Sequence, residues 1–343
     1  MILTYVKELD SKDHRILYNL FLNSRQSLSS IGKKVGLPKN VVKYRIDRLT
    51  ENGIIENFNA MVDVFKLGYS VYRLNFVLQF ASPEKEKEII DYFTKSENTW
   101  RVESSKGRYD LMVTILVKNH NHFFSFYEDT LKQFRYYFKE IFFSQLYEMY
   151  GYRQAILFDE TSSSKKEYEY RYNGEIVKID ETDYKILYLL SKNSRINSIE
   201  IAKNVDTTSS TVISRIKKLI QLGVIQKYSI DINYNKIGYK SFIVNLSIRN
   251  YEKKNNIISY LSNIPFICEI HKAIGGCDLE ISLFTLNFEY FHRLMEDLRN
   301  KFPEDLTNYD YLFITKIYKA NCIPKTSRLW INSINQIYFN LFF

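Results

Sequence analysis

The sequence predicts an α+β fold made of two copies of one unit, in which a helical part precedes a part with the element order βαββαβ. The first observation is a repeat: LDSKDHRILYNLFLNSR, from Leu9, aligns without a gap with IDETDYKILYLLSKNSR, from Ile179. The second is that the same register holds at Gly53 and Gly223 and slips by two residues where GRYDL meets GGCDL. The third is a change of apolar spacing from helical to alternating within each copy. Self-similarity of this length indicates a tandem duplication.

The composition is that of an ordinary globular protein. The 343 residues are 45% hydrophobic and 25% charged, and the formal net charge of +9 favours a polyanionic partner. No run of apolar residues is long enough for a transmembrane helix, so we expect no membrane association. Cys268, Cys277 and Cys322 are too few and too scattered for a disulfide framework or a zinc site. We therefore expect a cytoplasmic protein without a metal or another cofactor.

The helical part of the first copy contains signals for three short helices. Asp10, or Asp13 after it, can cap a helix that runs to about Asn23, and a second helix, LSSIGKKVG, ends at Gly36. A third helix is expected from about Lys39 to Asn52, followed by an alternating segment, IIENFNAMVDV, which we interpret as a hairpin. Three short helices and a hairpin are typical of a winged helix-turn-helix domain, whose third helix fits the major groove of DNA.

The outward face of the third helix and the basic residues around it are the candidate DNA contacts. In the first copy they are Lys39, Asn40, Lys43, Tyr44, Arg45 and Arg48. In the second copy, where Thr208 caps the third helix, they are Ser209, Ser210, Ser214, Arg215, Lys217 and Lys218. Because the second set has shorter and less charged side chains, we expect the second copy to make weaker or less specific base contacts.

The second part of the first copy has the order βαββαβ. Strands are expected in SVYRLNFVLQF, TWRVESS, YDLMVTILV and KEIFFSQLYEMY, with helices in SPEKEKEIIDYFTKS and NHFFSFYEDTLKQFRYYF. This order is that of a ferredoxin-like domain, whose helices cover one face of the sheet. We expect the two uncovered faces to pack against each other, so that one chain forms an intramolecular pseudo-dimer. The alternative is pairing between chains with domain exchange.

These observations divide the chain into six segments. Residues 1–60 and 179–230 are expected to be winged helix-turn-helix domains, and residues 61–157 and 231–323 to be ferredoxin-like βαββαβ domains that bind ligand and mediate assembly. Residues 158–178 are polar and lack periodicity, which indicates a linker. Residues 324–343 form an apolar, aromatic tail, which we expect to pack on a domain surface or on a partner.

Two series of motifs resemble the Lrp/AsnC (feast/famine) regulators. LSSIGKKVGLPKNVVKYRIDRLTENGII is followed by LGY and GRYDL, and INSIEIAKNVDTTSSTVISRIKKLIQLGVI is followed by IGY and GGCDL. The resemblance implies a transcription regulator that binds double-stranded DNA and responds to a small effector such as an amino acid. It places the effector near the G-x-x-D turns, at Gly107, Tyr109, Asp110, Gly275, Gly276 and Asp278. The same residues also fit a purely structural role in turns, through positive φ and a hydrogen bond from backbone to side chain.

Two other functions are alternatives to transcription regulation. Siroheme decarboxylases resemble this family and also occur as two-unit fusions, but their sheet domains carry a His-rich stretch, whereas the matching segments here contain only His271. A ligand sensor that has lost DNA binding would have a neutral third helix. The first copy argues against that with Lys39, Lys43, Arg45 and Arg48. Because the sequence lacks a Ser/His/Asp set and a glycine-rich phosphate loop, we expect no enzymatic activity. Members of the family usually carry one unit and form dimers or larger assemblies, so further homo-oligomerisation of this duplicated chain is left open.

Overall fold

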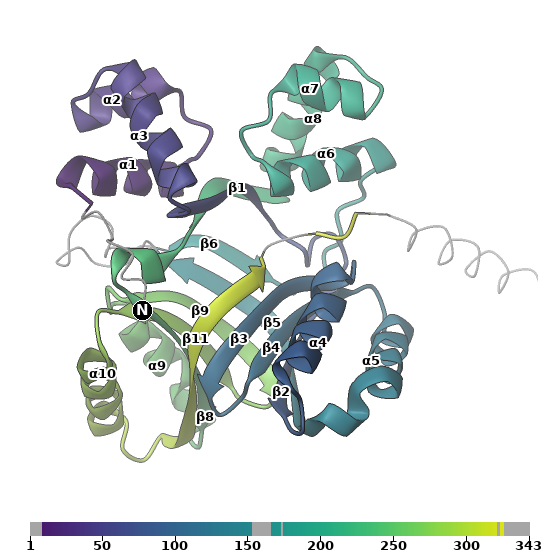
Figure 1. Cartoon of the computed structure of the whole chain (residues 1–343), viewed down its shortest axis with the longest axis vertical. Coiled ribbons are helices and arrows are strands. Elements are labelled where there is room, and N and C mark those ends of the chain that lie inside the picture. Colours follow the sequence, from purple (N-terminus) through teal and green to yellow (C-terminus); the bar gives the residue numbers. More distant parts are fainter. Residues whose placement is uncertain (1–8, 153–165, 173, 321–322, 326–343) are drawn as a thin grey trace, which may run out of the picture.

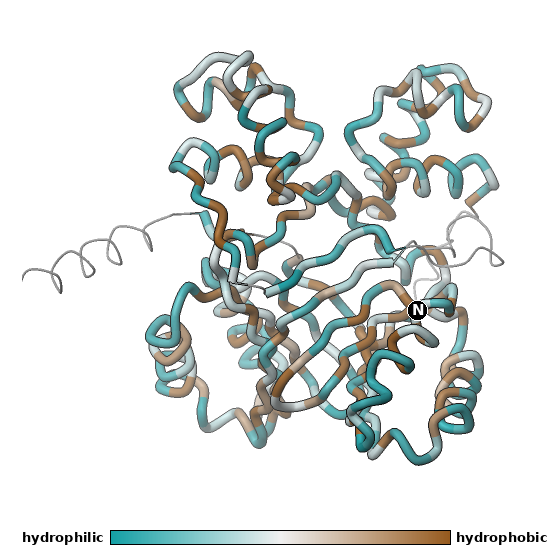
Figure 2. Tube along the Cα trace, turned by 180° about the vertical axis from the view of Figure 1, so that it is seen from behind, coloured by the Kyte–Doolittle hydropathy of each residue, from teal (hydrophilic) through white to brown (hydrophobic). Residues whose placement is uncertain are grey.

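The computed structural model describes residues 9–152, 166–172, 174–320 and 323–325. Two helical bundles stand on the same side of a closed β-sheet, and four further helices flank the outer faces of that sheet (Figure 1). Hydrophobic stretches are concentrated along the strands of the sheet and at the base of both bundles (Figure 2). Residues 326–343 of the predicted apolar tail lie outside the described residues. None of the described helices has the length and apolar character needed to cross a membrane.

The first bundle contains the three helices that the sequence predicts. They are α1 (Ser11–Leu22), α2 (Leu28–Val35) and α3 (Lys39–Glu51). Asp10 caps α1 with a reciprocal capping box, and Gly36 ends α2 in the left-handed conformation, where a residue without Cβ is favoured. Ile16, Leu20 and Val42 are fully buried between the helices, so the amphipathic spacing defines the core of the bundle.

The second bundle repeats this arrangement. It consists of α6 (Glu181–Lys192), α7 (Ser198–Asn204) and α8 (Ser209–Gln221). Asp180 caps α6 and Thr208 caps α8, each accepting a hydrogen bond from a backbone N–H of the first turn. The three helices of each copy therefore begin at equivalent positions of the repeat.

The hairpin predicted after the third helix is wrong. The segment forms one strand, β1 (Ile55–Val62), which pairs antiparallel with its counterpart β7 (Ile225–Ile232) from the other copy. No glycine or proline occurs between Gly53 and Gly68, so nothing in this stretch favours the tight turn that a hairpin needs. The single strand finds its antiparallel partner in the second copy instead.

The pairing of β1 with β7 exchanges packing surfaces between the two copies. The core of the first bundle includes Ile230 and Ile232 of β7, whereas the core of the second includes Ala60 and Val62 of β1. The exchange is symmetric at the loops that follow α1 and α6: the Ser24 N–H donates to the Tyr228 carbonyl, and the Ser194 N–H donates to the Phe58 carbonyl.

The hydroxyl groups of the equivalent residues Ser24 and Ser194 hydrogen-bond to each other at 2.7 Å in a buried position. A contact between equivalent residues marks a local pseudo-twofold axis through the β1–β7 pair. The two bundles are therefore related by this axis, and neither completes its core without a strand from the other copy.

The element order after each bundle is βαββαβ. The strands of the first copy are β2 (Ser70–Leu78), β3 (Thr99–Gly107), β4 (Leu111–Val117) and β5 (Phe138–Tyr152), with helices α4 (Pro83–Lys95) and α5 (His120–Phe134) and the short η1 (Arg135–Tyr137). Those of the second copy are β8 (Lys240–Ile248), β9 (Ile267–Gly275), β10 (Leu279–Thr285) and β11 (Leu306–Lys319), with helices α9 (Lys254–Leu261) and α10 (Phe288–Lys301) and the short η3 (Tyr234–Ile237) and η4 (Tyr251–Lys253). In each copy the helices pack on one sheet face, through apolar clusters that include Phe93 and Phe126 in the first and Phe291 and Leu298 in the second.

The two sheets do not form separate domains. The order is β5-β2-β4-β3 in one copy and β11-β8-β10-β9 in the other, and the pairs β3–β11 and β5–β9 join the copies at both edges. The eight strands thus form one closed ring, in place of the two separate sheets packed face to face that the sequence predicts. Closure pairs the edge strands of both four-stranded sheets, which removes the exposed backbone donors and acceptors that two open sheets would leave.

Part of the predicted linker is a strand. Residues Lys166–Arg171 form β6, which extends the sheet by pairing antiparallel with the last part of β5. The stretch KEYEYR alternates charged and aromatic residues, and Tyr168 and Tyr170 point to the buried side. The polar composition of the segment concealed this alternation, because four of its six residues are charged.

The exchanged packing predicts where core substitutions act. Ile230→Ala in β7 should cost about 2–4 kcal/mol, the range for a truncated core side chain, because it leaves a cavity under α1–α3. Hydrogen exchange should then show the larger loss of amide protection in α1–α3, although residue 230 lies in the second copy. Val62→Ala is the mirror experiment, and its loss should fall on α6–α8. Losses confined to each residue's own bundle would contradict the exchange.

Candidate nucleic-acid interface

One face of α3 is exposed and carries basic and polar side chains. Lys39, Asn40, Lys43 and Tyr44 all lie on this face, and the Tyr44 residue is 64% exposed. Val42, Ile46 and Leu49 lie on the opposite face and are buried in the bundle. Lys43 forms an ion pair with Asp47 at 2.6 Å, an exposed contact one turn further along the helix. Since exposed pairs of this kind contribute little to stability, Lys43 remains available to a phosphate or a base.

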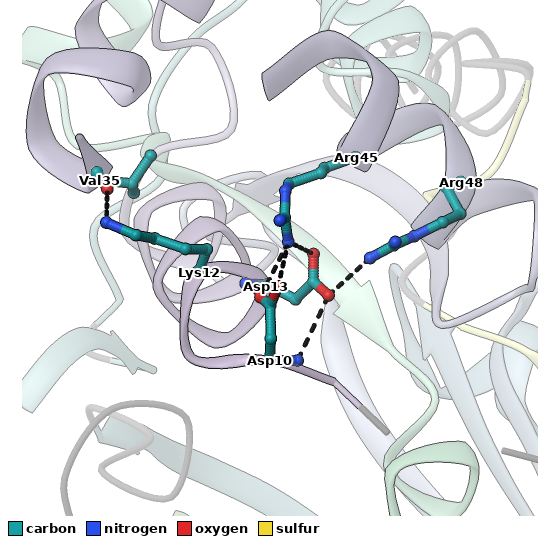
Figure 3. A network of polar contacts seen from close by, with 6 residues as sticks. All are labelled: Asp10, Lys12, Asp13, Val35, Arg45 and Arg48. Carbon is teal, nitrogen blue, oxygen red and sulfur yellow. Dashed lines mark hydrogen bonds and ion pairs between the residues drawn. The ribbon is translucent and has the colours of Figure 1, made fainter. Parts of the chain in front are cut away.

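Arg45 and Arg48 instead turn toward α1 (Figure 3). The Arg45 guanidinium lies 2.8 Å from an Asp10 carboxylate oxygen and 2.9 Å from one of Asp13, and the Arg48 guanidinium lies 2.6 Å from Asp13. Burial alone would raise the pKa of Asp10, but hydrogen bonds from Arg45 and from the backbone of Asp13 outweigh it and lower this pKa. The Asp10 carboxylate in turn raises the pKa of Arg45. These two arginines hold α3 against the start of α1, which the sequence analysis did not anticipate.

The exposed face of α8 differs from that of α3. Ser210, Ser214, Lys217 and Lys218 are exposed, together with Ile213, which is 44% exposed. Ser209 is half-buried, and its hydroxyl lies 2.7 Å from that of Ser198.

Arg215 repeats the role of Arg45 in the second bundle. Its guanidinium lies 2.6 Å from Asp180 and 2.8 Å from Asp183. Lys218, at the position equivalent to Arg48, is exposed. The second helix thus presents hydroxyls, an apolar group and two lysines.

The G-x-x-D turns lie at the seams between the two copies. Gly107 has φ +123°, and a Cβ on it would lie 2.5 Å from the Tyr311 carbonyl of β11. Gly275 has φ +114°, and its Cβ would lie 2.8 Å from the Phe143 carbonyl of β5. Only a residue without a side chain tolerates both the conformation and the close approach, so each glycine is needed for closure of the sheet.

The other residues of these turns are also engaged in the fold. The Asp110 carboxylate accepts a hydrogen bond from the Leu78 N–H at 2.9 Å, and that of Asp278 accepts one from the Ile248 N–H at 2.7 Å. The Tyr109 ring is buried against Phe142, with 5.3 Å between the ring centroids. Gly276 follows Gly275 in its turn, and a Cβ there would meet the Phe143 carbonyl at an ordinary 3.6 Å. This geometry matches the structural role that was weighed for the turn residues.

A charged network inside the closed sheet was not predicted from the sequence. Arg73 of β2 lies 2.5 Å from Glu280 of β10 and 3.6 Å from Glu103 of β3, and all three are buried. Arg101 lies 2.7 Å from Glu103, and His271 Nδ1 lies 3.0 Å from Glu280. Burial would raise the pKa of Glu280, but Arg73 and His271 outweigh it and lower this pKa. In the sequence, a single charged residue inside an apolar strand indicates such a network. Examples are Arg73 in SVYRLNFVL and Glu280 in LEISLFT.

Comparison with known proteins identifies the two helical bundles. A family model described as winged helix-turn-helix DNA-binding matches residues 9–56 and 179–226, which are the two helical bundles and the start of β1 and β7. The protein is therefore a winged helix-turn-helix DNA-binding protein with two such modules.

Curated relatives define the family more closely. An uncharacterized HTH-type transcriptional regulator from Pyrococcus abyssi is 35% identical over 106 residues, which cover 31% of this chain and 72% of that relative. The HTH-type transcriptional regulator FL11 from the same organism is 35% identical over 118 residues, 34% of this chain and 77% of FL11. The chain belongs to the Lrp/AsnC family of transcription regulators, in tandem-duplicated form.

A solved structure resembles nearly the whole chain. The siroheme decarboxylase NirDL matches with a TM-score of 0.60 over 96% of this chain and 99% of that chain, at 14% sequence identity. At this identity the likeness concerns the fold, and it shows that the arrangement of two bundles on a sheet domain occurs elsewhere.

The ion pairs of Arg45 (Figure 3) and those of its counterpart Arg215 predict unequal losses of stability. Arg45→Ala should lower the free energy of unfolding by about 2 kcal/mol, less than the roughly 3–5 kcal/mol for breaking a fully buried pair, because Arg48 still contacts Asp13. Arg215→Ala should cost more, because Arg215 is the cation that the described residues place beside Asp183. Urea denaturation of each variant measures the difference. An Arg45→Ala protein of unchanged stability that has lost DNA affinity would instead assign Arg45 to phosphate contact.

Proposed function

We propose that one chain binds DNA as a pseudo-dimer, with α3 and α8 each entering the major groove of one half-site. The observation that carries this is the contact between Ser24 and Ser194, which relates the two bundles by a local pseudo-twofold axis. A twofold arrangement of two recognition helices matches the pseudo-palindromic operators of dimeric helix-turn-helix proteins. In most such proteins the second helix comes from a second chain, whereas here it is supplied by the same polypeptide.

The two half-sites are proposed to be read differently. Asn40, Lys43 and Tyr44 can donate to base edges and phosphates, since long polar side chains on an exposed helix face supply most direct readout. On α8 the corresponding surface has Ser210 and Ser214 beside Ile213, which suits a thymine methyl group and short-range hydroxyl contacts. Lys39, Lys217 and Lys218 would serve the phosphate backbone, as would Ser209 at the start of α8 if it exchanges its contact with Ser198 for one to DNA.

The effector site implied by the resemblance stays a prediction at the G-x-x-D turns. What supports it is the position of these turns at the seams between the copies. What weighs against it is that Asp110 and Asp278 already accept hydrogen bonds from backbone N–H groups. Assembly of the chain into larger homo-oligomers likewise stays a prediction.

Substitution of the recognition lysines tests the unequal reading of half-sites. Against a duplex from the chain's own upstream DNA, Lys43→Ala should weaken binding more than Lys217→Ala. A lost base contact costs about 1–3 kcal/mol, and a lost phosphate contact lowers the salt slope by about one. Fluorescence anisotropy at several salt concentrations, with a scrambled duplex alongside, gives both quantities.

The matched control for this comparison is Lys87→Ala on α4. Lys87 pairs with Asp91 at 2.6 Å in the same i,i+4 geometry as Lys43 with Asp47, but it lies on a helix that flanks the sheet. It should leave DNA affinity unchanged. Equal losses for Lys43→Ala and Lys217→Ala would contradict unequal readout, and no binding to either duplex at low salt would contradict the regulator.

The enzymatic alternative has a separate test. NirDL is a siroheme decarboxylase of the same fold, so siroheme is the substrate to try. We expect its absorption spectrum to stay unchanged when the protein is added, because His271, the one histidine of the matching segments, is buried and bonded to Glu280. A saturable spectral shift followed by loss of a carboxylate as CO₂ would favour the enzyme.

A further inference from the structure

A cavity of about 370 Å³ lies between the β1–β7 pair and the closed sheet. Strand β7 contributes Lys227, Ser229 and Asp231 to its wall, and Met61 comes from β1. Strands of the closed sheet supply the opposite wall, with Arg101, Glu103, Glu269 and Ser282 among its residues. A smaller pocket of about 40 Å³ shares these last four residues and extends the space to Arg73 and His271. The volume suits a small molecule, and its walls come from both copies.

The two carboxylates of the opposite wall, Glu103 and Glu269, differ in their partners. The Glu103 carboxylate lies beside the guanidinium groups of Arg73 and Arg101, at 3.6 and 2.7 Å. The Glu269 carboxylate accepts a hydrogen bond from Tyr168 and lies 3.5 Å from His271 Nε2. Within the described part of the chain, no lysine or arginine forms an ion pair with Glu269. The cavity therefore presents a carboxylate whose described partners are a tyrosine hydroxyl and a histidine ring.

Buried polar atoms beside this carboxylate also lack partners. Among the described residues, His271 Nε2 and Thr114 Oγ1 have no hydrogen-bond partner, although both residues are 2% exposed and line the smaller pocket. An unsatisfied buried polar group destabilises the folded state, so a polar ligand group in this pocket would remove an existing penalty.

The rest of the wall is aromatic. Tyr152, Tyr168 and Phe284 line the cavity, and Phe284 is stacked on Tyr234 with 3.7 Å between the ring centroids. Aromatic faces attract cations and also pack against an apolar body. The wall also carries the carboxylates of Glu56, Glu103, Asp231 and Glu269, which an anionic ligand would meet. Of the three cations that line it, Arg101 pairs with Glu103 and Lys227 with Glu167, and Lys316 lies over the Tyr318 ring.

We propose that this cavity binds a small amine, whose protonated amino group lies on Glu269 and whose apolar body lies against the aromatic wall, and that its occupancy changes DNA affinity. The second half of this statement rests on the proposed DNA binding, and the first half does not. The site differs from the G-x-x-D turns in place and in chemistry, because it requires an amine and no carboxylate.

The coupling follows from connectivity. β7 carries wall residues and precedes β8 of the sheet, with the short η3 between them, while α8 directly precedes β7. A ligand that contacts both β7 and the sheet favours one spacing between them. It therefore biases the arrangement of α3 and α8 by as much as its affinity differs between arrangements.

A titration with 2-phenylethylamine tests the binding site. Isothermal calorimetry and the fluorescence of Trp100, which lines the smaller pocket, should both show saturable binding. L-phenylalanine, phenylacetate and 2-phenylethanol share the ring and differ in charge, and each should bind at least roughly tenfold more weakly, since the carboxylate on the cavity wall selects a cation. The Glu269→Gln variant should bind 2-phenylethylamine roughly tenfold or more weakly than the wild type. Glu289→Gln, the same change on exposed α10, should have no effect.

A second variant guards against misfolding of Glu269→Gln. Ser282→Leu fills the space shared by both pockets and should abolish binding in a protein that still unfolds cooperatively. Lack of saturable binding of 2-phenylethylamine to the wild type, equal binding of phenylacetate, or an unaffected Glu269→Gln would each overturn the site.

The effect of the amine on DNA affinity is measured separately. Saturating 2-phenylethylamine should change the affinity of the wild type for its upstream duplex at least threefold and leave that of Ser282→Leu unchanged. Amine binding with unaltered DNA affinity would overturn the coupling. Absence of DNA binding with and without the amine would instead overturn the regulator proposal, while the titration still decides the site.

Discussion

The antiparallel pairing of β1 with β7 is the interaction on which the rest of the structure depends. Each strand completes the apolar core of the other copy's helical bundle, so the bundles cannot fold as independent units with the packing described here. The same pairing places Ser24 against Ser194 and fixes the pseudo-twofold relation between α3 and α8. It also joins the bundles to the sheet, because β1 leads into β2 and β7 into β8. Duplication of one unit thus gives a single chain the internal symmetry that related regulators with one unit would obtain by association.

Closure of the sheet imposes a second constraint. Two four-stranded sheets joined at both edges enclose an interior that contains Arg73, Glu103 and Glu280 as well as apolar side chains such as Met112 and Leu312. Buried charges of this kind are costly unless paired, and the pairs here connect strands of both copies. The network therefore links the two halves through directional contacts. A further carboxylate beside this network, that of Glu269, lines the cavity between the closed sheet and the β1–β7 pair. The interior of the sheet and the DNA-binding modules therefore meet at this cavity.

Much of the architecture could be predicted from the sequence, because it depends on local signals. Asp10, Gly36 and Thr208 begin or end helices through capping, which acts over a few residues. The pairing of β1 with β7 could not be predicted in this way, since residues 55–62 alternate in the same manner whether their partner is a hairpin or a strand 170 residues away. The strand β6 was missed because its aromatic alternation is carried by a strongly charged segment. At the candidate interface, helical spacing separated Lys43 and Tyr44 from the core, but it did not show that Arg45 and Arg48 reach back to Asp10 and Asp13, which lie more than thirty positions earlier.

We propose that one polypeptide is the complete DNA-binding unit. Native mass spectrometry of the chain with a duplex that spans one protected footprint measures the number of chains per duplex directly. We expect a complex of one chain with one duplex, in which hydroxyl-radical footprinting shows two protected regions one helical turn, roughly 34–36 Å, apart. Two chains bound to that duplex, each protecting a single region, would show that the intramolecular pair does not engage DNA as proposed.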